Sequence, residues 1–384
     1  MTIVIQIYII VCIALLVFDI CFLFLKNRKK EVFFPKNEKL EKQILDEIGA
    51  FHQQGKFSSD FETTLSRKLN KTQNLITLMT ILEENPKFKE KFRPIIFDKI
   101  DEYAKKSDYE QAYYTYVIST FDYENVEIFG SFAVQFIKFL DSKSLYTFVN
   151  TMEAIYAFGQ DNLLLQALDK VDQREGFYNQ KLLVDGLLSA KVDFDSFNQK
   201  LISQFPTYSD TTKAALLDYF RYNGAEISDM CLAILNKPNV ENEVRYSAMR
   251  YFTKYQNESA NAYCLQLLKN EETEWVEQML SIQILSKSNH PFAYSTIKEK
   301  IYSQNWYVRL NAAKYLYDCH LNQTEMYEIL SKKDKYANEI LLYVYRDNSE
   351  MSEFISSTIQ KFEEEEQEKG QNHSSKVNMT AQPA

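Results

Sequence analysis

Cysteine and histidine are the residues of this chain whose chemistry would be easiest to recognise, because thiolates and imidazoles bind zinc or act in catalysis at short, defined spacings. The chain of 384 residues has 5 cysteines and 4 histidines. All are scattered along it: Cys12, Cys21, Cys231, Cys264, Cys319, His52, His290, His320 and His373. Zinc-binding, metalloprotease, nucleophile-elbow and phosphate-loop motifs are missing from the sequence. We predict no metal, no cofactor and no catalytic residue, although a site assembled from distant residues is not excluded.

The amino-acid composition further narrows the classes of protein to which this chain could belong. Only 8 glycines and 7 prolines are present, which argues against glycine-rich phosphate loops. Hydrophobic residues make up 45% and charged residues 25%, which excludes disorder over most of the chain. The net charge of -9 disfavours a partner that is a nucleic acid.

Residues 3–25 predict one transmembrane helix. This run is apolar except for Asp19 and contains neither glycine nor proline. A helix of this length spans about 34 Å, enough to cross a hydrocarbon core of about 30 Å. Residues 1–2 carry no Lys or Arg and no cleavage site follows, so we predict an uncleaved anchor rather than a signal peptide.

The flanks of this segment predict its orientation. Four basic residues follow it within the neck, residues 26–36: Lys26, Arg28, Lys29 and Lys30. Because such residues concentrate on the cytoplasmic side, we expect a single-pass protein of the cell membrane with residues 1–2 outside and the main domain in the cytoplasm. The basic residues would contact anionic headgroups. Asp19 either reaches the inner interface or contacts the transmembrane helix of a partner.

The C-terminal half contains an internal repeat. Three segments align at a spacing of 32 residues through Val244, Val276 and Val308. Apolar residues recur four and eight positions later in each segment: Ala248, Leu280 and Ala312, then Phe252, Ile284 and Leu316. A second helical stretch precedes each aligned segment, at 229–236, 260–269 and 293–302. Two helices per repeat form an antiparallel pair that buries its apolar face only against its neighbours.

This pattern predicts an all-α chain. The predicted parts after the neck are degenerate helical repeats over 37–180, repeats of 32-residue period over 181–348, a C-terminal helix over 349–369 and a disordered tail over 370–384. The upstream part is assigned to the same array because its helical periodicity continues and no linker rich in glycine, proline or serine separates the halves.

The segment Trp306 to Leu316, with Val-Arg followed by Ala-Ala, resembles the second helix of a HEAT repeat. The likeness is greatest to the short HEAT-like class named from phycobilin lyases, and it extends over residues 206–320. It implies a right-handed α-solenoid of stacked antiparallel helix pairs. It also implies that Arg245 and Arg309 are structural and bond to an acidic side chain in the next turn or repeat.

Helical geometry selects candidate partner-binding residues between the buried positions of the second helices. These are Tyr246, Arg250, Gln278, Ile282, Leu310 and Lys314. Alternatively, Ile282 and Leu310 merely pack against neighbouring helices. Together these features favour a membrane-anchored cytoplasmic scaffold that binds or regulates a protein partner, for example within an envelope-polysaccharide or signalling complex. The alternatives are a HEAT-like enzyme of lyase type and a receptor for a peptide tail.

Overall fold

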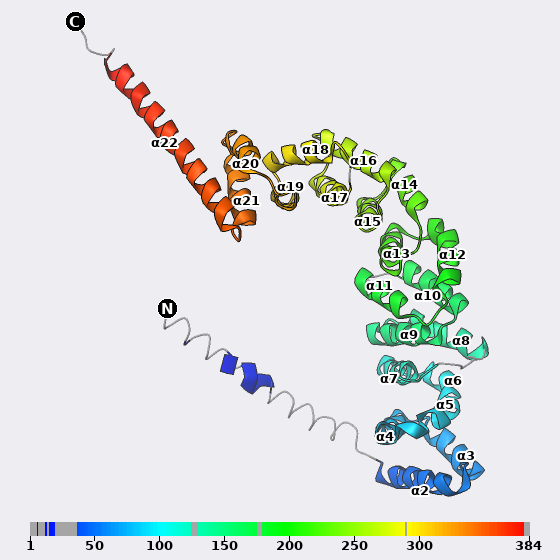
Figure 1. Cartoon of the computed structure of the whole chain (residues 1–384). Coiled ribbons are helices and arrows are strands. Elements are labelled where there is room, and N and C mark those ends of the chain that lie inside the picture. Colours follow the sequence, from blue (N-terminus) through cyan, green and yellow to red (C-terminus); the bar gives the residue numbers. More distant parts are fainter. Residues whose placement is uncertain are drawn as a thin grey trace. The chain divides into compact units, whose positions relative to one another are not determined.

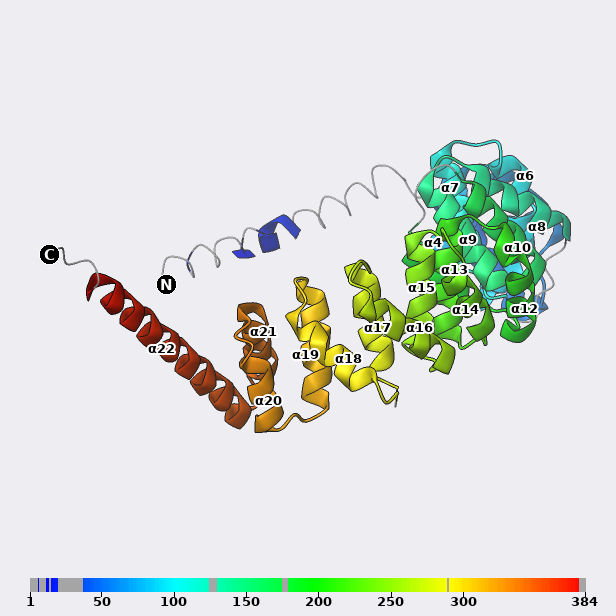
Figure 2. The same ribbon diagram turned by 90° about the horizontal axis from the view of Figure 1, so that it is seen from above.

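The computed structural model describes residue 6 and residues 12–13, 15–19, 37–123, 130–174, 179–288 and 290–379. Over these residues the secondary structure is helical, without a strand, so the prediction of an all-α chain is confirmed. The chain divides into two compact units, Met1–Leu201 and Ile202–Ala384, called unit 1 and unit 2 below. Figures 1 and 2 show the helices of each unit in two views.

Unit 1 contains helices of uneven length. Its elements are α2 (Glu38–Gln54), α3 (Ser59–Lys68), α4 (Thr72–Glu84), η1 (Pro86–Phe88), α5 (Lys89–Phe97), α6 (Ile100–Tyr103), α7 (Asp108–Ser119), α8 (Gly130–Phe136), η2 (Ile137–Asp141), α9 (Leu145–Phe158), α10 (Asp161–Gln173), α11 (Gln180–Ser189) and α12 (Phe194–Gln204), the last of which ends in unit 2. Helix α4 packs against α2 and α7, while α9 packs against α7 and α11.

Aromatic rings fill much of the core of unit 1. Phe97 stacks on Phe132 with ring centroids 4.3 Å apart, and Tyr103 stacks on Tyr114 at 4.5 Å. Phe136 is fully buried and contacts three other phenylalanine rings. Rings of this size bury large areas and favour offset or edge contacts, so they join helices of different length and spacing.

Unit 2 contains a more regular series. Its remaining elements are η3 (Phe205–Thr207), α13 (Asp210–Asn223), α14 (Ser228–Asn236), α15 (Asn242–Phe252), α16 (Glu258–Lys269), α17 (Trp275–Leu285), α18 (Ala293–Glu299), η4 (Lys300–Tyr302), α19 (Trp306–Asp318), α20 (Gln323–Leu330), α21 (Lys335–Tyr345) and α22 (Ser349–Met379). We call α13, α15, α17, α19 and α21 the second helices, and α14, α16, α18 and α20 the first helices.

The second helices of unit 2 form one row. Helix α15 packs against α13 and α17, and α19 packs against α17 and α21. The first helices pack along one side of this row, as Figure 1 shows for α14, α16 and α18. Of the nine aligned apolar residues, Val276 is half-buried and the others are buried: Val244, Ala248, Phe252, Leu280, Ile284, Val308, Ala312 and Leu316. The 32-residue period therefore corresponds to the buried face of the row.

The two ends of the chain stand differently against the sequence predictions. The C-terminal helix is longer than predicted, and most of the N-terminal segment lies outside the described residues. Helix α22 continues to Met379, past the predicted end at residue 369, because a single Gly370 weakens a helix without stopping it and residues 349–379 contain no proline. Asp19 lies in a short described helical segment and is exposed. Lys26, Arg28, Lys29, Lys30 and most of residues 3–25 lie outside the described residues. No helix within the described ranges is both long and apolar enough to cross a membrane.

Candidate binding surface

Capping side chains fix where the second helices begin. The Glu241 carboxylate accepts from the backbone N–H of Val244 before α15, and the Asn305 side chain accepts from Tyr307 and Val308 before α19. Asp334 does the same for Ala337 before α21. Such caps satisfy amide groups that the first helical turn leaves without a partner. Helices α15, α17 and α19 start within two residues of the aligned Val244, Val276 and Val308, so side chains of their first turns lie in register along one edge of unit 2.

The structure corrects two of the six predicted partner-binding residues. Tyr246 is 6% exposed and Ile282 is 1% exposed, so neither is available on the surface of unit 2. The Tyr246 hydroxyl donates to Glu274 at 2.8 Å, and burial together with this carboxylate raises the pKa of Tyr246. For Ile282, the alternative that it packs against neighbouring helices holds. The prediction failed because α15 and α17 are buried over more of their circumference than one apolar stripe.

The other four predicted residues do not form one exposed surface either. Arg250 is half-buried and forms an ion pair with Glu243 at 3.4 Å. Gln278 donates to the carbonyl of Thr273 at 2.7 Å, and Leu310 is half-buried. Lys314 alone among the six is exposed. The middle of the second helices therefore offers little free surface for a partner.

Arg245 and Arg309 connect neighbouring elements, but by different means. Arg245 on α15 forms an ion pair with Glu277 on α17 at 3.7 Å, as the resemblance implied. Burial raises the pKa of Glu277, while Arg245 opposes this effect. Arg309 is buried and donates instead to the carbonyls of Ser303 and Gln304 at 2.6 and 2.8 Å. Its guanidinium lies 4.9 Å from the ring centroid of Tyr336 on α21, so the expected acidic partner is replaced by carbonyls and a ring.

Three exposed aromatic side chains gather at the starts of α17 and α19; we call Trp275, Trp306 and Tyr307 the aromatic edge. Trp275, Trp306 and Tyr307 are 43%, 45% and 51% exposed. Trp275 stacks on Tyr307 with centroids 5.3 Å apart, and Trp306 meets Tyr307 edge to face at 5.1 Å. Large rings are normally buried or placed at interfaces, so the exposure of three rings in mutual contact makes the aromatic edge the candidate binding surface of unit 2.

The residues of the aromatic edge were not among those predicted from the sequence. The chain has 2 tryptophans, and each is the first residue of one of two successive second helices. The signal was therefore present just before the aligned Val276 and Val308. Apolar periodicity selects residues between the buried positions in mid-helix and does not distinguish residues of the first turn.

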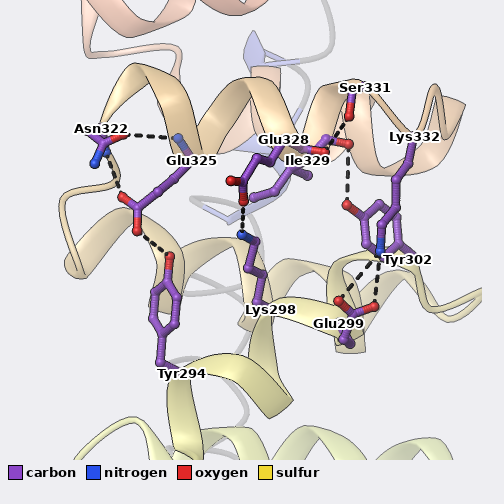
Figure 3. Close-up of polar contacts among 10 residues, drawn as sticks. All are labelled: Tyr294, Lys298, Glu299, Tyr302, Asn322, Glu325, Glu328, Ile329, Ser331 and Lys332. Atoms are coloured by element: carbon purple, nitrogen blue, oxygen red, sulfur yellow. Dashed lines mark hydrogen bonds and ion pairs between the residues drawn. The ribbon is translucent and has the colours of Figure 1, made fainter.

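Polar contacts on the first-helix side serve packing. Figure 3 shows the Tyr294 hydroxyl donating to Glu325 at 3.0 Å, and Lys298 paired with Glu328 at 2.9 Å. Lys332 pairs with Glu299 at 3.2 Å, and its ammonium lies 4.2 Å from the ring centroid of Tyr302. These groups already satisfy one another between α18, η4 and α20. This side of unit 2 is consequently a less favourable place for a ligand.

A hollow in unit 1 carries several charges. It lies at η2 and α10, with a volume of about 460 Å³, and its cationic lining residues are Lys143, Lys170 and Arg174. Lys170 is paired with Asp141 at 2.6 Å. Arg174 donates to the carbonyls of Leu140 and Ser142, both at 3.1 Å. Two of its three cations are therefore already engaged within the chain.

Nothing in these sites defines a known class of protein by itself. Comparison of the chain with known protein families, with curated proteins and with solved structures gives no match. Within the described ranges, no group of three or more His, Cys, Asp or Glu side chains could hold a metal ion.

Proposed function

We propose that this protein is a non-enzymatic scaffold, anchored in the cell membrane by residues 3–25, whose cytoplasmic helical repeats hold a protein partner at the inner face. The architecture proposed is a right-handed α-solenoid of HEAT type. The membrane part rests on the sequence: an apolar run of sufficient length, followed by Lys26, Arg28, Lys29 and Lys30.

Contacts between neighbouring repeats support the solenoid. Lys254 donates to the carbonyl of Arg221, 33 residues away, and Lys287 donates to the carbonyl of Thr253, 34 residues away. Tyr294 and Glu325 are 31 residues apart. Hydrogen bonds that repeatedly join residues about one repeat apart are typical of arrays in which each unit contacts its nearest neighbours.

The single observation that carries the binding role is the aromatic edge. Trp and Tyr are enriched at the centres of protein interfaces because they bury a large area with few rotatable bonds. Packing within unit 2 leaves all three rings of the edge about half exposed. A scaffold with such a surface gains from its anchor, because confinement to the membrane raises the effective concentration of a partner held there.

The test is affinity purification from detergent after crosslinking in cells, with three chains compared. These are the full chain, a chain truncated before Glu31, and a chain whose residues 3–25 are replaced by an unrelated single-pass helix. We expect the full chain to remain in the membrane pellet at alkaline pH and to retain a defined partner. The truncated chain should leave the pellet and lose that partner, whereas the helix-replaced chain should keep both. A full chain that is extracted at alkaline pH, or catalytic turnover by the purified chain, would contradict the proposal.

A further inference from the structure

We propose that the aromatic edge binds an extended peptide segment of the partner that carries Lys or Arg residues. This inference rests on the proposed function and deepens it by naming the chemistry of the partner. It follows from the arrangement of rings and carboxylates at one register position of the second helices.

The register position is the one just before the aligned Val244, Val276, Val308 and Ile340. On the successive helices α15, α17, α19 and α21 it holds Glu243, Trp275, Tyr307 and Glu339. All four side chains are exposed. Each helix packs against the next in this order, so the helices on either side of the stacked aromatic pair both carry an exposed carboxylate. Glu243 lies in the first turn of α15, as the two rings lie in the first turns of α17 and α19, whereas Glu339 lies about one turn further into α21.

Further negative charge lies beside Trp275. Glu274 directly precedes it, Glu272 lies three residues before it, and both are exposed. Within the described part of the chain neither of them forms an ion pair, although Glu274 accepts the hydroxyl of Tyr246. Glu243 and Glu339 pair with Arg250 and Lys335 at 3.4 and 3.9 Å. Pairs this exposed contribute little and can exchange partners.

This combination favours a cationic ligand. A guanidinium or ammonium group is attracted to the face of an aromatic ring and to a neighbouring carboxylate at once. Anionic headgroups and nucleic acids would be repelled by the same carboxylates. A neutral sugar would stack on the rings but gain nothing from the charge. A peptide with basic residues on both sides of its centre can contact both the rings of the aromatic edge and the carboxylates of Glu243 and Glu339.

The spacing of the helices sets the length of this peptide. Packed helices lie about 8–10 Å apart, so three steps from α15 to α21 cover about 24–30 Å. An extended chain advances about 3.3 Å per residue, and about seven to nine residues therefore span the distance. We expect one basic residue near each end, opposite Glu243 and Glu339.

The test is selection of a displayed library of random 12-residue peptides on the full chain in detergent. The enriched peptides are then titrated by fluorescence polarisation. We expect them to carry Lys or Arg on both sides of their centre and to bind more weakly as salt rises. Trp275→Ala and Tyr307→Ala should each weaken binding about tenfold or more, as truncation of an interface anchor does. Glu243→Lys and Glu339→Lys, which change only exposed residues, should weaken it about threefold or more.

Matched controls make the result specific. Tyr343 on α21 has the same exposure as Tyr307, 51%, but lies outside the edge, so Tyr343→Ala should leave binding unchanged. Glu353→Lys on α22 is the control for charge. Enrichment of neutral or acidic peptides, equal loss in the controls, no enrichment at all, or sugar binding abolished by Trp306→Ala would overturn the inference. A crosslinked partner that every edge variant retains would also overturn it; the scaffold would then hold its partner through another surface, and the membrane anchor would still be tested by the truncated chain.

Discussion

Unit 1 and unit 2 are built from the same element, a short helix, but they use different side chains to join one helix to the next. In unit 1 the joints are mainly aromatic, as in the ring contacts of Phe136 and the stacked pair Tyr103 and Tyr114. In unit 2 buried rings such as Phe252 also occur, but most residues at the fixed spacing are small or aliphatic, such as Ala248 and Ala312. Small residues hold neighbouring helices at one distance, so their spacing repeats. Aromatic residues can fill varied distances between helices, so the sequence of unit 1 shows no regular repeat period.

The largest expected effect of a single change is in the aromatic core of unit 1. Phe136→Ala removes a fully buried ring that contacts Phe132, Phe139 and Phe158. We expect unit 1 to lose about 3–5 kcal/mol of its free energy of unfolding. Hydrogen exchange of the full chain would show lost protection in α8 and α9 and little change in α17 to α21. Tyr146→Ala, at a ring that is 78% exposed, is the control.

A smaller loss of stability is expected when a small buried residue between the second helices of unit 2 is enlarged. Ala312→Leu enlarges a fully buried residue between packed second helices. Overpacking of this kind costs about 1–3 kcal/mol. Protection should fall in α17, α19 and α21 together, because the side chain pushes on both neighbours. Lys314→Leu, two residues further along the same helix and exposed, should change stability by less than about 0.5 kcal/mol. An equal loss in both variants would contradict the proposed role of the small residue.

Tyrosine hydroxyls form a third kind of joint, and their removal should cost less. Tyr103 is fully buried, and its hydroxyl donates to the carbonyl of Leu69 at 3.0 Å. Tyr103→Phe keeps the ring and removes this bond, so we expect a loss of about 1 kcal/mol. The fall in the denaturation midpoint of unit 1, followed by hydrogen exchange in α3 and α6, measures it. Tyr146→Phe, at a residue that is 78% exposed, should leave the midpoint unchanged.

The smallest expected effect is the change in stability on acidification. Protonation of one glutamate should destabilise unit 1, whereas protonation of another should not destabilise unit 2. Thr72, Lys106 and Ser107 bond to Glu110 and lower its pKa to about 2. A lowered pKa means stability that is present above the unfolded value of about 4.3 and is lost as pH falls toward 2. Burial raises the pKa of Glu277, so its ionisation costs stability as pH rises from the unfolded value through the folded one.

Acidification from pH 5 to pH 3 should therefore loosen the contact between α4 and α7 through Glu110, whereas Glu277 should not loosen the contact between α15 and α17. Hydrogen exchange, corrected for its intrinsic dependence on pH, distinguishes the two. Glu110→Gln should reduce the acid sensitivity of α4 and α7. Because the Glu110 side chain is partly exposed, we expect a loss below about 1 kcal/mol. Equal acid sensitivity in the variant and the parent chain would argue against this account.

The helices of unit 2 could be predicted because their signals are local and repeated. The expected stretches 229–236 and 260–269 agree closely with α14 (Ser228–Asn236) and α16 (Glu258–Lys269). In unit 1 the expected degenerate repeats over 37–180 have no such fixed spacing, and the structure has two short helices, α5 and α6, with a break between them. Apolar periodicity alone does not reveal that break, because aromatic contacts from other helices fill the space around it.

The candidate site was harder to predict than the helices. An apolar stripe identifies one buried face, but α15 also buries Tyr246, Ser247 and Met249 because it packs against α13, α14 and α17. Which further faces become buried depends on partners that are distant in the sequence. The aromatic edge belongs to the first turns, where helix packing ends and side chains are left exposed.

The short reach of the hydrogen bonds in unit 2 has a mechanical consequence. Lys254, Lys287 and Tyr294 bond to groups 31 to 34 residues away, so each bond closes a short loop. Tension applied to such an array opens it one hairpin at a time from an end, and the opened part can close again without waiting for the rest. Under tension, unit 2 should accordingly lengthen in small reversible steps of about one hairpin each, as an elastic element does.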